Sequence, residues 1–354
     1  KLEIEEDRQA KLPDHVNPMG TVGAHYTAPM LLRSKLLATL LVVPRLLGLK
    51  RLPDVATVSR TLAGLDDTGV ANLRRLVRQR VLEQLGALAL ARITLDFDGS
   101  VLSTGRFAEG TAVGFNRKKK GQRSYYPLYC TIAQTGQVLD VLHRSGNVHD
   151  SNGADEFMMR CFEELRHKLS GTTFESRMDS AFFSQKVLPI FDANHVMFTA
   201  SVPFERLTEL KGIIEQRKRW RRIDKEWSYF ETNWKPKSWD TTYRFIFTRR
   251  KTRKQRKGPI QLDLFEPRDF NYDYKVIVTN KSESAKAVVL FHNGRGSQEA
   301  IFGDAKGDCG LNVIPTRRLI GNQVYTLCSM MAHNLSRELQ MISAPAAHRA
   351  RPKR

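Results

Sequence analysis

Hydrophobic positions in the first quarter of the chain recur at the spacing of amphipathic helices. One stripe consists of leucines between residues 31 and 41, and a second runs along residues 67–90. Because apolar residues three or four positions apart share one face of a helix, each stripe predicts a helix. Between the stripes, Ser59 and Thr61 predict a cap or a turn. We therefore expect a helical N-terminal region over residues 1–92.

The pattern changes at Ile93, where apolar and polar residues begin to alternate. This alternation predicts a strand that ends at Gly99, because successive strand side chains point to opposite faces. The elements that follow are two hairpin strands, a helix, a strand, a helix that begins after Asp179, and a strand. Apart from that second helix, their predicted ranges are residues 125–132, 138–144, 154–169, 173–178 and 196–202. This order is typical of a mixed α/β layer fold, and we assign residues 93–202 to the first part of its core.

Residues 203–280 differ from this core in composition. All four tryptophans of the chain fall within them, at Trp220, Trp227, Trp234 and Trp239. A basic run at residues 249–257 holds seven cations in nine positions and is flanked by strand-like segments. We therefore predict a β-rich insertion with a basic loop, after which the core resumes over residues 281–342. A basic tail occupies residues 343–354.

The charge of the chain narrows the classes of partner. Its 354 residues include 57 Lys+Arg and 37 Asp+Glu, which gives a formal net charge of +20. Such an excess predicts a polyanionic partner, either a nucleic acid or a membrane surface. The longest apolar stretch, residues 30–49, contains three cations and a proline, which excludes it as a membrane span. The N-terminal helices then have two interpretations, a DNA-binding domain or a plain helical cap on the core.

The four cysteines exclude one common metal site. Cys130, Cys161, Cys309 and Cys328 form no C-x-x-C pair, so a zinc ribbon is not expected. Their wide spacing in a chain of this size does not suggest a disulfide framework either. We expect reduced thiols in a cytosolic protein.

Two aspartates near the end of the first core strand are candidate metal ligands. Asp96 and Asp98 share one face of that strand, opposite Leu95 and Phe97. Two carboxylates beside an apolar strand are costly to bury unless they are paired or bind a metal. This segment alone leaves open a divalent-metal site and an acidic strand end that only forms a turn.

Asp179 and a later helical segment supply the other candidates. Asp179 follows a strand and opens a helix, so it is either a metal ligand or a helix N-cap. Arg295, Glu299 and Lys306 would share one face of a helix, because four and seven residues separate them. That face is either a solvated ion-pair surface or a phosphate-binding surface. The glycines on both sides of Arg295 would allow the backbone to approach a phosphate closely.

The first two segments carry a resemblance to a known family. Leu95-Asp-Phe-Asp-Gly-Ser and Asp179-Ser-Ala-Phe resemble the first two motifs of the DDE transposases of bacterial insertion sequences. More narrowly, the chain is similar to the insertion-sequence-four superfamily and its thirteen-eighty group. The resemblance covers roughly residues 93–340.

The third family motif, Y-x2-R-x3-E-x6-K, matches with one departure. Arg295, Glu299 and Lys306 stand at the right spacings, and His292 takes the place of the tyrosine. A histidine can still donate a hydrogen bond to a phosphate. The interval of 120 positions between Asp179 and Glu299 is similar to the one that holds the family's β-rich insertion.

The resemblance implies a fold and an activity. The fold is an RNase H-like mixed-sheet core, interrupted by the β-rich insertion. The catalytic residues would be Asp98, Asp179 and Glu299, which would hold two Mg²⁺ ions, with Mn²⁺ as a substitute. The enzyme would cut transposon ends and join them to target DNA, with a hairpin intermediate on this branch of the family.

The implied partner is double-stranded DNA, in the form of inverted-repeat transposon ends and target DNA. We expect a homodimer in the DNA complex, no membrane partner, and a bacterial cytoplasmic location at the nucleoid. In the family, an insertion-domain tryptophan can stack on a flipped base, whereas ordinary packing is the alternative for each tryptophan here. The residues expected to bind DNA are His292, Arg295, Lys306, Arg249, Arg250, Lys251, Arg253 and Lys254.

Two alternatives share the same sequence features. One is an RNase H-like nuclease without strand transfer, and the other is a catalytically inactive DNA-binding descendant. The presence of all three acids argues against an inactive descendant, and the missing tyrosine argues for one. An RNA-binding protein would need a motif such as R-G-F-x-F, which the chain lacks.

Overall fold

A nine-stranded mixed sheet organises the chain in the computed structural model, which describes residues 54–114, 116, 119–251 and 272–343. Its strands, in the order in which they lie side by side, are β6 (Val138–Leu142), β5 (Leu128–Ile132), β1 (Arg92–Gly99), β7 (Thr173–Met178), β8 (Met197–Ser201), β12 (Tyr272–Thr279), β11 (Tyr243–Lys251), β10 (Trp227–Trp234) and β9 (Arg221–Arg222). A second sheet has three strands, in the order β2 (Leu102–Thr104), β4 (Arg123–Tyr125) and β3 (Ala112–Val113).

The direction of the strands changes at β1. β5 and β6 form an antiparallel hairpin, and β5 pairs antiparallel with β1. On the other side of β1, β7 runs parallel to it, and β8 runs parallel to β7. Because parallel neighbours end at the same edge of a sheet, the carboxyl ends of β1 and β7 lie side by side.

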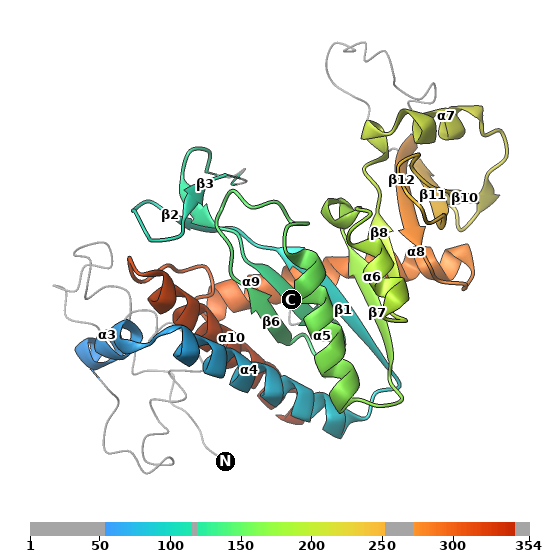
Figure 1. Ribbon diagram of the computed structural model, residues 1–354. Helices are drawn as coiled ribbons and strands as arrows, with labels where there is room; N and C mark the ends of the chain where they lie inside the picture. Colours follow the sequence, from blue (N-terminus) through green and yellow to red (C-terminus); the bar gives the residue numbers. More distant parts are fainter. Residues whose placement is uncertain (1–53, 115, 117–118, 252–271, 344–354) are drawn as a thin grey trace, which may run out of the picture.

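Strands from the predicted insertion continue the same sheet. β12 pairs antiparallel with β8, with Val278 opposite Ala200, and β11 and β10 follow as antiparallel neighbours. Figure 1 shows β10, β11 and β12 with α7 (Thr208–Gln216) at the end of the molecule opposite α3 (Val55–Gly64). The strands of the predicted insertion and those of the preceding core therefore belong to one hydrogen-bonded layer.

Helices pack on both faces of this layer. α4 (Asp67–Leu88) and α10 (Leu319–Ser343) lie side by side, and α5 (Ala154–Lys168) contacts α4 (Figure 1). The bounds of the remaining helices are η1 (Ser180–Phe182), α6 (Leu188–Ala193), η2 (Phe204–Arg206), α8 (Ala285–Asn293), η3 (Gly294–Gly296) and α9 (Ser297–Asp308).

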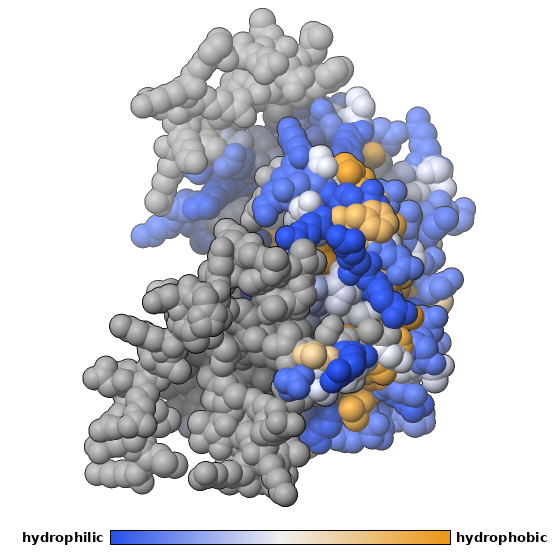
Figure 2. All heavy atoms as spheres, turned by 90° about the vertical axis from the view of Figure 1, so that its left-hand side faces the viewer, coloured by the Kyte–Doolittle hydropathy of each residue, from blue (hydrophilic) through white to orange (hydrophobic). Residues whose placement is uncertain are grey.

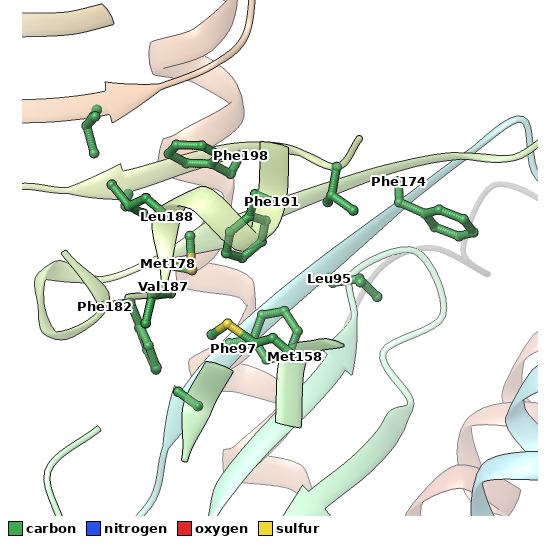
Figure 3. Packing of buried hydrophobic residues seen from close by; sticks show 14 of the residues in the cluster. Leu95, Phe97, Met158, Phe174, Met178, Phe182, Val187, Leu188, Phe191 and Phe198 are labelled. Carbon is green, nitrogen blue, oxygen red and sulfur yellow. The ribbon is translucent and has the colours of Figure 1, made fainter. Parts of the chain in front are cut away.

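The main hydrophobic core lies between α5 and the sheet. Leu95 and Phe97 of β1 are fully buried, as the alternating pattern predicted (Figure 3). The Phe97 ring makes edge-to-face contacts with Phe157 and Phe162 of α5, each at 6.1 Å between centroids. Burying each such ring stabilises the fold by about 1.5 to 3 kcal/mol. This packing holds one face of β1 against α5, and the polar side chains of β1 therefore lie on its other face.

Most predicted elements of residues 93–202 are confirmed, and three earlier predictions are wrong. The predicted strand at 125–132 is divided between β4 and β5, which belong to different sheets. The helix expected after Asp179 is the short 3-10 helix η1. The strand at residues 173–178 has its predicted limits, and the helix at 154–169 ends one residue sooner. Ser59 and Thr61 form no turn, because both lie inside α3, whose first turn is capped by Asp54 at 2.7 Å from the Thr57 amide. The leucine stripe at residues 31–41 lies outside the described residues.

One side of the described surface is largely polar. Figure 2 shows mainly hydrophilic residues on one side of the molecule, with isolated hydrophobic residues among them. Within the described ranges, no helix is long and apolar enough to cross a membrane. Of the four cysteines, Cys130 and Cys161 are buried and all four are free thiols.

α10 is tied to the edge of the sheet by polar side chains. The Asn334 carboxamide accepts from the Val138 amide and donates to the Val138 carbonyl, both at 2.8 Å. His333 Nε2 lies 2.8 Å from the Gly136 carbonyl, and Arg337 donates to Thr135. These contacts protect the β5–β6 turn at an edge that would otherwise be open.

We predict that Asn334→Ala lowers the free energy of unfolding by about 2 to 4 kcal/mol, because it leaves two buried backbone groups without their partner. Urea denaturation measures this loss. The matched control is Asn72→Ala on the exposed face of α4, which should change stability by less than about 0.5 kcal/mol. Equal effects of the two substitutions would contradict the role given to Asn334.

Candidate active site

Asp98 and Asp179 meet at one edge of the sheet. Asp98 is the penultimate residue of β1, and Asp179 directly follows β7. The parallel register pairs Asp96 with Arg177, so Asp98 and Asp179 stand two positions further along their strands. Asp179 also caps η1, because its Oδ1 accepts from the Ala181 amide at 2.9 Å. The cap and a role in the site are therefore compatible.

The two carboxylates repel each other in a partly desolvated place. Burial, followed by the Asp179 charge, raises the pKa of Asp98 to about 7, although the nearby Arg295 partly offsets both. Burial likewise raises the pKa of Asp179. Two partly buried carboxylates that repel each other favour either a shared proton or a bound cation. Carboxylate oxygens are the ligands that Mg²⁺ and Mn²⁺ prefer, so this pair fits a divalent ion.

Asp96, the neighbouring candidate, is already paired. Its side chain is fully buried, and Arg177 donates to both of its oxygens, at 2.7 Å and 2.5 Å. Arg177 also lies over the Phe291 ring and against Gly294, where a Cβ would come within 2.2 Å of its Nη1. Asp96 therefore anchors the third segment to β1, while Asp98 faces the edge.

The third segment approaches the pair through Arg295. Arg295 lies in η3, and its Nη1 is 3.8 Å from Asp98 Oδ2. At the start of α9, buried Gln298 donates to the Asp96 carbonyl at 2.9 Å and to Thr131 at 3.0 Å. Glu299 is exposed in this first turn. Within the described ranges, no three His, Cys, Asp or Glu side chains are grouped closely enough to hold a metal ion.

His292 is placed in the interior. It is buried on α8, with Nδ1 3.0 Å from Thr199 Oγ1 and Nε2 2.9 Å from Ser201 Oγ, both on β8. Burial, followed by the Arg295 charge, lowers the pKa of His292 to about 3, so the ring is neutral. Its two nitrogens thus fasten α8 to β8, and the structure does not bring this ring to an exposed position beside the acids.

The basic candidates of the insertion stand on aromatic rings. Arg249 lies over Trp220 and Tyr272, at 4.6 Å and 4.3 Å from the ring centroids. Arg250 lies over Trp227 and pairs with Glu226, and Lys251 is exposed at the end of β11. Arg253 and Lys254 lie outside the described residues. Lys306 is half-buried in the last turn of α9.

The tryptophans take part in packing within the insertion and, at Trp239, against the preceding core. Trp239 is buried against Phe183, at 4.7 Å between centroids. Trp220 packs edge-to-face on Phe230, also at 4.7 Å. Trp227, beside Arg250, is half-buried, and Trp234 packs on a core phenylalanine.

One site residue was missed from the sequence. Asp150, in the loop between β6 and α5, raises the pKa of both Asp98 and Asp179 through its charge. It stands in a polar stretch without periodicity, so no pattern marked it.

The fold and site define a mixed α/β protein with an acidic centre at the end of two parallel strands. A protein-family model described as "Transposase DDE domain group 1" matches residues 35–353. The chain therefore belongs to the DDE transposase family.

The chain is also similar to a solved transposase structure, at low identity. A cryo-electron microscopy structure of a piggyBac transposase synaptic complex with hairpin DNA is similar at 12% identity, with a TM-score of 0.38. The similarity covers 73% of this chain and 52% of that one, which is about half of its length. Among curated proteins, none matches the chain.

The raised pKa of Asp98 leads to a stability prediction for the metal-free protein. Below about pH 4 the carboxyl is protonated in both folded and unfolded chains, so it has no effect. As the pH rises to 7, the unfolded chain ionises while the folded chain keeps the proton, and the folded state loses stability. Asp98→Asn removes this loss, so it should stabilise the protein by about 2 to 4 kcal/mol at pH 8 and by little at pH 4.

Denaturation in EDTA across this pH range measures the effect. The control is Asp308→Asn, at the exposed end of α9, which should show no comparable dependence on pH. A destabilising Asp98→Asn at pH 8 would contradict the electrostatic account.

Proposed function

We propose that the chain is a DNA transposase of an insertion sequence, of the insertion-sequence-four superfamily and its thirteen-eighty group. It cuts the ends of its element and joins them to target DNA. The observation that carries this proposal is the pairing of Asp98 with Asp179 at the ends of adjacent parallel strands, in a chain of the DDE transposase family. The direction change at β1 and the helices on both faces support an RNase H-like core.

The catalytic residues of this proposal are Asp98, Asp179 and Glu299. Asp98 and Asp179 would hold Mg²⁺, or Mn²⁺ in its place, and Glu299 would complete the set from the first turn of α9. When bound, the ions supply activation of the attacking oxygen and stabilisation of the leaving oxygen. Gln298 supports this role for Glu299, because it ties that turn to β1 at the Asp96 carbonyl.

The cations of the third segment would position DNA. Arg295, beside Asp98, is placed to contact a phosphate at the acidic pair, and Lys306 would contact a neighbouring phosphate. His292 is buried, so we assign it to holding α8 against β8 and not to a phosphate. The residues of the basic run would contact DNA further from the cut, namely Arg249, Arg250, Lys251, Arg253 and Lys254.

The remaining parts of the proposal follow from the family resemblance. The N-terminal helical region, residues 1–92, would help to recognise inverted-repeat ends. The residues 203–280 would form the insertion between the two parts of the core, residues 93–202 and 281–342. We propose a homodimer on two transposon ends, a hairpin intermediate, and action at the bacterial nucleoid.

One observation favours a second candidate, a catalytically inactive DNA-binding descendant. Glu299 is exposed, and no three-acid group is close enough to hold a metal in the described ranges. Such a protein would bind the element's ends without cutting them. Labelled DNA carrying those ends, incubated with the protein and Mg²⁺, separates the candidates, because only the transposase yields 3′ nicks and joined products. Nicks without joined products would indicate a nuclease instead.

We predict that Asp98→Ala and Asp179→Ala each reduce cleavage by at least about 1000-fold, because each removes a proposed metal ligand. Gel-shift affinity for the end DNA should remain within about threefold of the wild type. Asp96→Ala should instead lower stability, because Arg177 would be left buried and unpaired. Full cleavage by Asp98→Ala, with a selective loss in folded Asp96→Ala, would reverse the assignment of the two acids.

We also predict that the basic end of β11 contributes to DNA binding. Each phosphate contact changes the slope of log affinity against log salt by about 0.9. Replacing Arg249, Arg250 and Lys251 together by Gln should therefore flatten the slope by up to about 2.7, measured by gel shift between 50 and 200 mM salt. Lys168→Gln, at the exposed end of α5, is the control. An unchanged slope in the triple variant would remove this strand end from the DNA surface.

A further inference from the structure

Phe107 is an exposed aromatic residue in the loop that follows β2 of the second sheet. Its side chain belongs to a residue with 64% of its surface exposed, and no other aromatic residue of the described ranges is exposed to this degree. The guanidinium carbon of Arg123, on β4, lies over the ring at 5.2 Å from its centroid. Because the guanidinium covers one face of the ring, the other face and the edge form the exposed part.

The loop that carries Phe107 is fastened on two sides. Arg123 Nε donates to Thr111 Oγ1 at 3.0 Å, and its Nη2 donates to the Thr111 carbonyl. On the other side, the Glu109 amide donates to the Arg317 carbonyl at 2.8 Å, in the segment before α10. The position of the exposed ring is therefore set by the fold of the protein itself.

The second sheet is strongly cationic. Residues 101–125 hold six Lys+Arg and a single acid, Glu109. That acid is engaged elsewhere, because its Oε2 accepts from the Leu319 amide at the start of α10, at 3.0 Å. Arg106, next to the ring in sequence, and Lys120, in the loop before β4, are exposed. An aromatic platform in a cationic setting is the combination that binds single-stranded nucleic acid, because bases stack on the ring and cations contact the phosphates.

The second sheet also begins next to the acidic pair. Two residues, 100 and 101, separate the end of β1 from the start of β2. Phe107 follows Asp98 by nine positions, so the two backbones are at most about 30 Å apart. Figure 1 shows β2 and β3 apart from β10, β11 and β12, so this surface is separate from the tryptophans of the insertion. A DNA strand whose nucleotides rise about 3.4 Å each can contact both Asp98 and Phe107 within about ten nucleotides.

We infer that Phe107, braced by Arg123 and flanked by Arg106, is a contact surface for single-stranded DNA, on which an unpaired base stacks. This inference rests on the proposed function, which supplies a DNA strand released by cutting near this sheet. The ring is already held on one face, so little conformational entropy is lost when a base covers the other. Paired bases are already stacked on their neighbours, so the surface should favour unpaired strands over a duplex.

Fluorescence anisotropy with a labelled oligothymidine, measured in EDTA so that no cutting occurs, tests the inference on the full-length protein. Phe107→Ala should weaken binding at least about fivefold, because it removes the stacking platform. Phe107→Tyr keeps the ring and should bind within about twofold of the wild type. The matched control is Leu290→Ala on α8, an apolar residue that is 60% exposed, which should leave the affinity unchanged.

The dependence on salt separates stacking from charge. Stacking releases no counterions, so Phe107→Ala should keep the wild-type slope of log affinity against log salt. Arg106→Gln should instead flatten the slope by up to about 0.7, the value for one phosphate contact on a single strand. On a blunt duplex, Phe107→Ala should lose less affinity than on oligothymidine. An equal loss on both probes would overturn the stacking of an unpaired base.

The outcomes distinguish this inference from the proposed function. Wild-type affinity of Phe107→Ala for oligothymidine would overturn the inference, whereas nicks and joined products from the wild type would still support the transposase. A dimer that dissociates in Phe107→Ala, with unchanged affinity for oligothymidine, would show a protein contact and also overturn the inference. Binding of oligothymidine that depends on Phe107, in a protein that neither nicks nor joins DNA, would support the surface and overturn the proposed function.

Discussion

Repulsion between Asp98 and Asp179 is the constraint around which this end of the molecule is arranged. Parallel pairing of β1 with β7 brings the two strand ends together, and burial raises the pKa of both carboxyls. Such a pair is unfavourable for folding, so the surrounding structure must hold it. Phe97 holds the pair in place from the opposite face of β1, because its packing on α5 prevents the strand from turning its acidic face away. Burial of the hydrophobic core next to this edge offsets the destabilisation caused by the two carboxylates.

The buried pair of Asp96 and Arg177 transmits this arrangement to the third segment. Breaking such a pair by removing one partner costs about 3 to 5 kcal/mol, so it resists rearrangement. Arg177 spans from β7 to β1, and it also contacts the segment around Phe291 and Gly294. The position of Arg295 beside Asp98 therefore depends on an ion pair one layer deeper in the sheet. Two aspartates on one face of a strand thus have different environments because only the outer one reaches the edge.

Local sequence patterns predicted those parts of the structure that depend on local interactions. Alternation identified β1, and helical spacing identified α5, because each buries one regular face. The resemblance picked out Asp98, which the structure places next to Asp179. Pairing of β12 with β8, which joins the insertion to the main sheet, depends on strands that lie far apart in sequence. For the same reason the burial of His292 and the approach of Asp150 had no signal, since both depend on contacts between distant elements.

Not all of the cations behind the net charge of +20 face solvent, because several arginines serve the fold. Arg144 and Arg177 are buried and hold a loop and a strand, so they do not form part of an outer basic surface. Arg249 and Arg250 differ from these two, since their guanidinium carbons lie over tryptophan rings, at 4.6 Å and 5.6 Å from the ring centroids. Stacking uses the face of a guanidinium, whereas hydrogen bonds to phosphate leave from its edge, so the two interactions are compatible. A stacked arginine also loses less conformational entropy on binding, which makes these rings a means of preparing the cations for a polyanion.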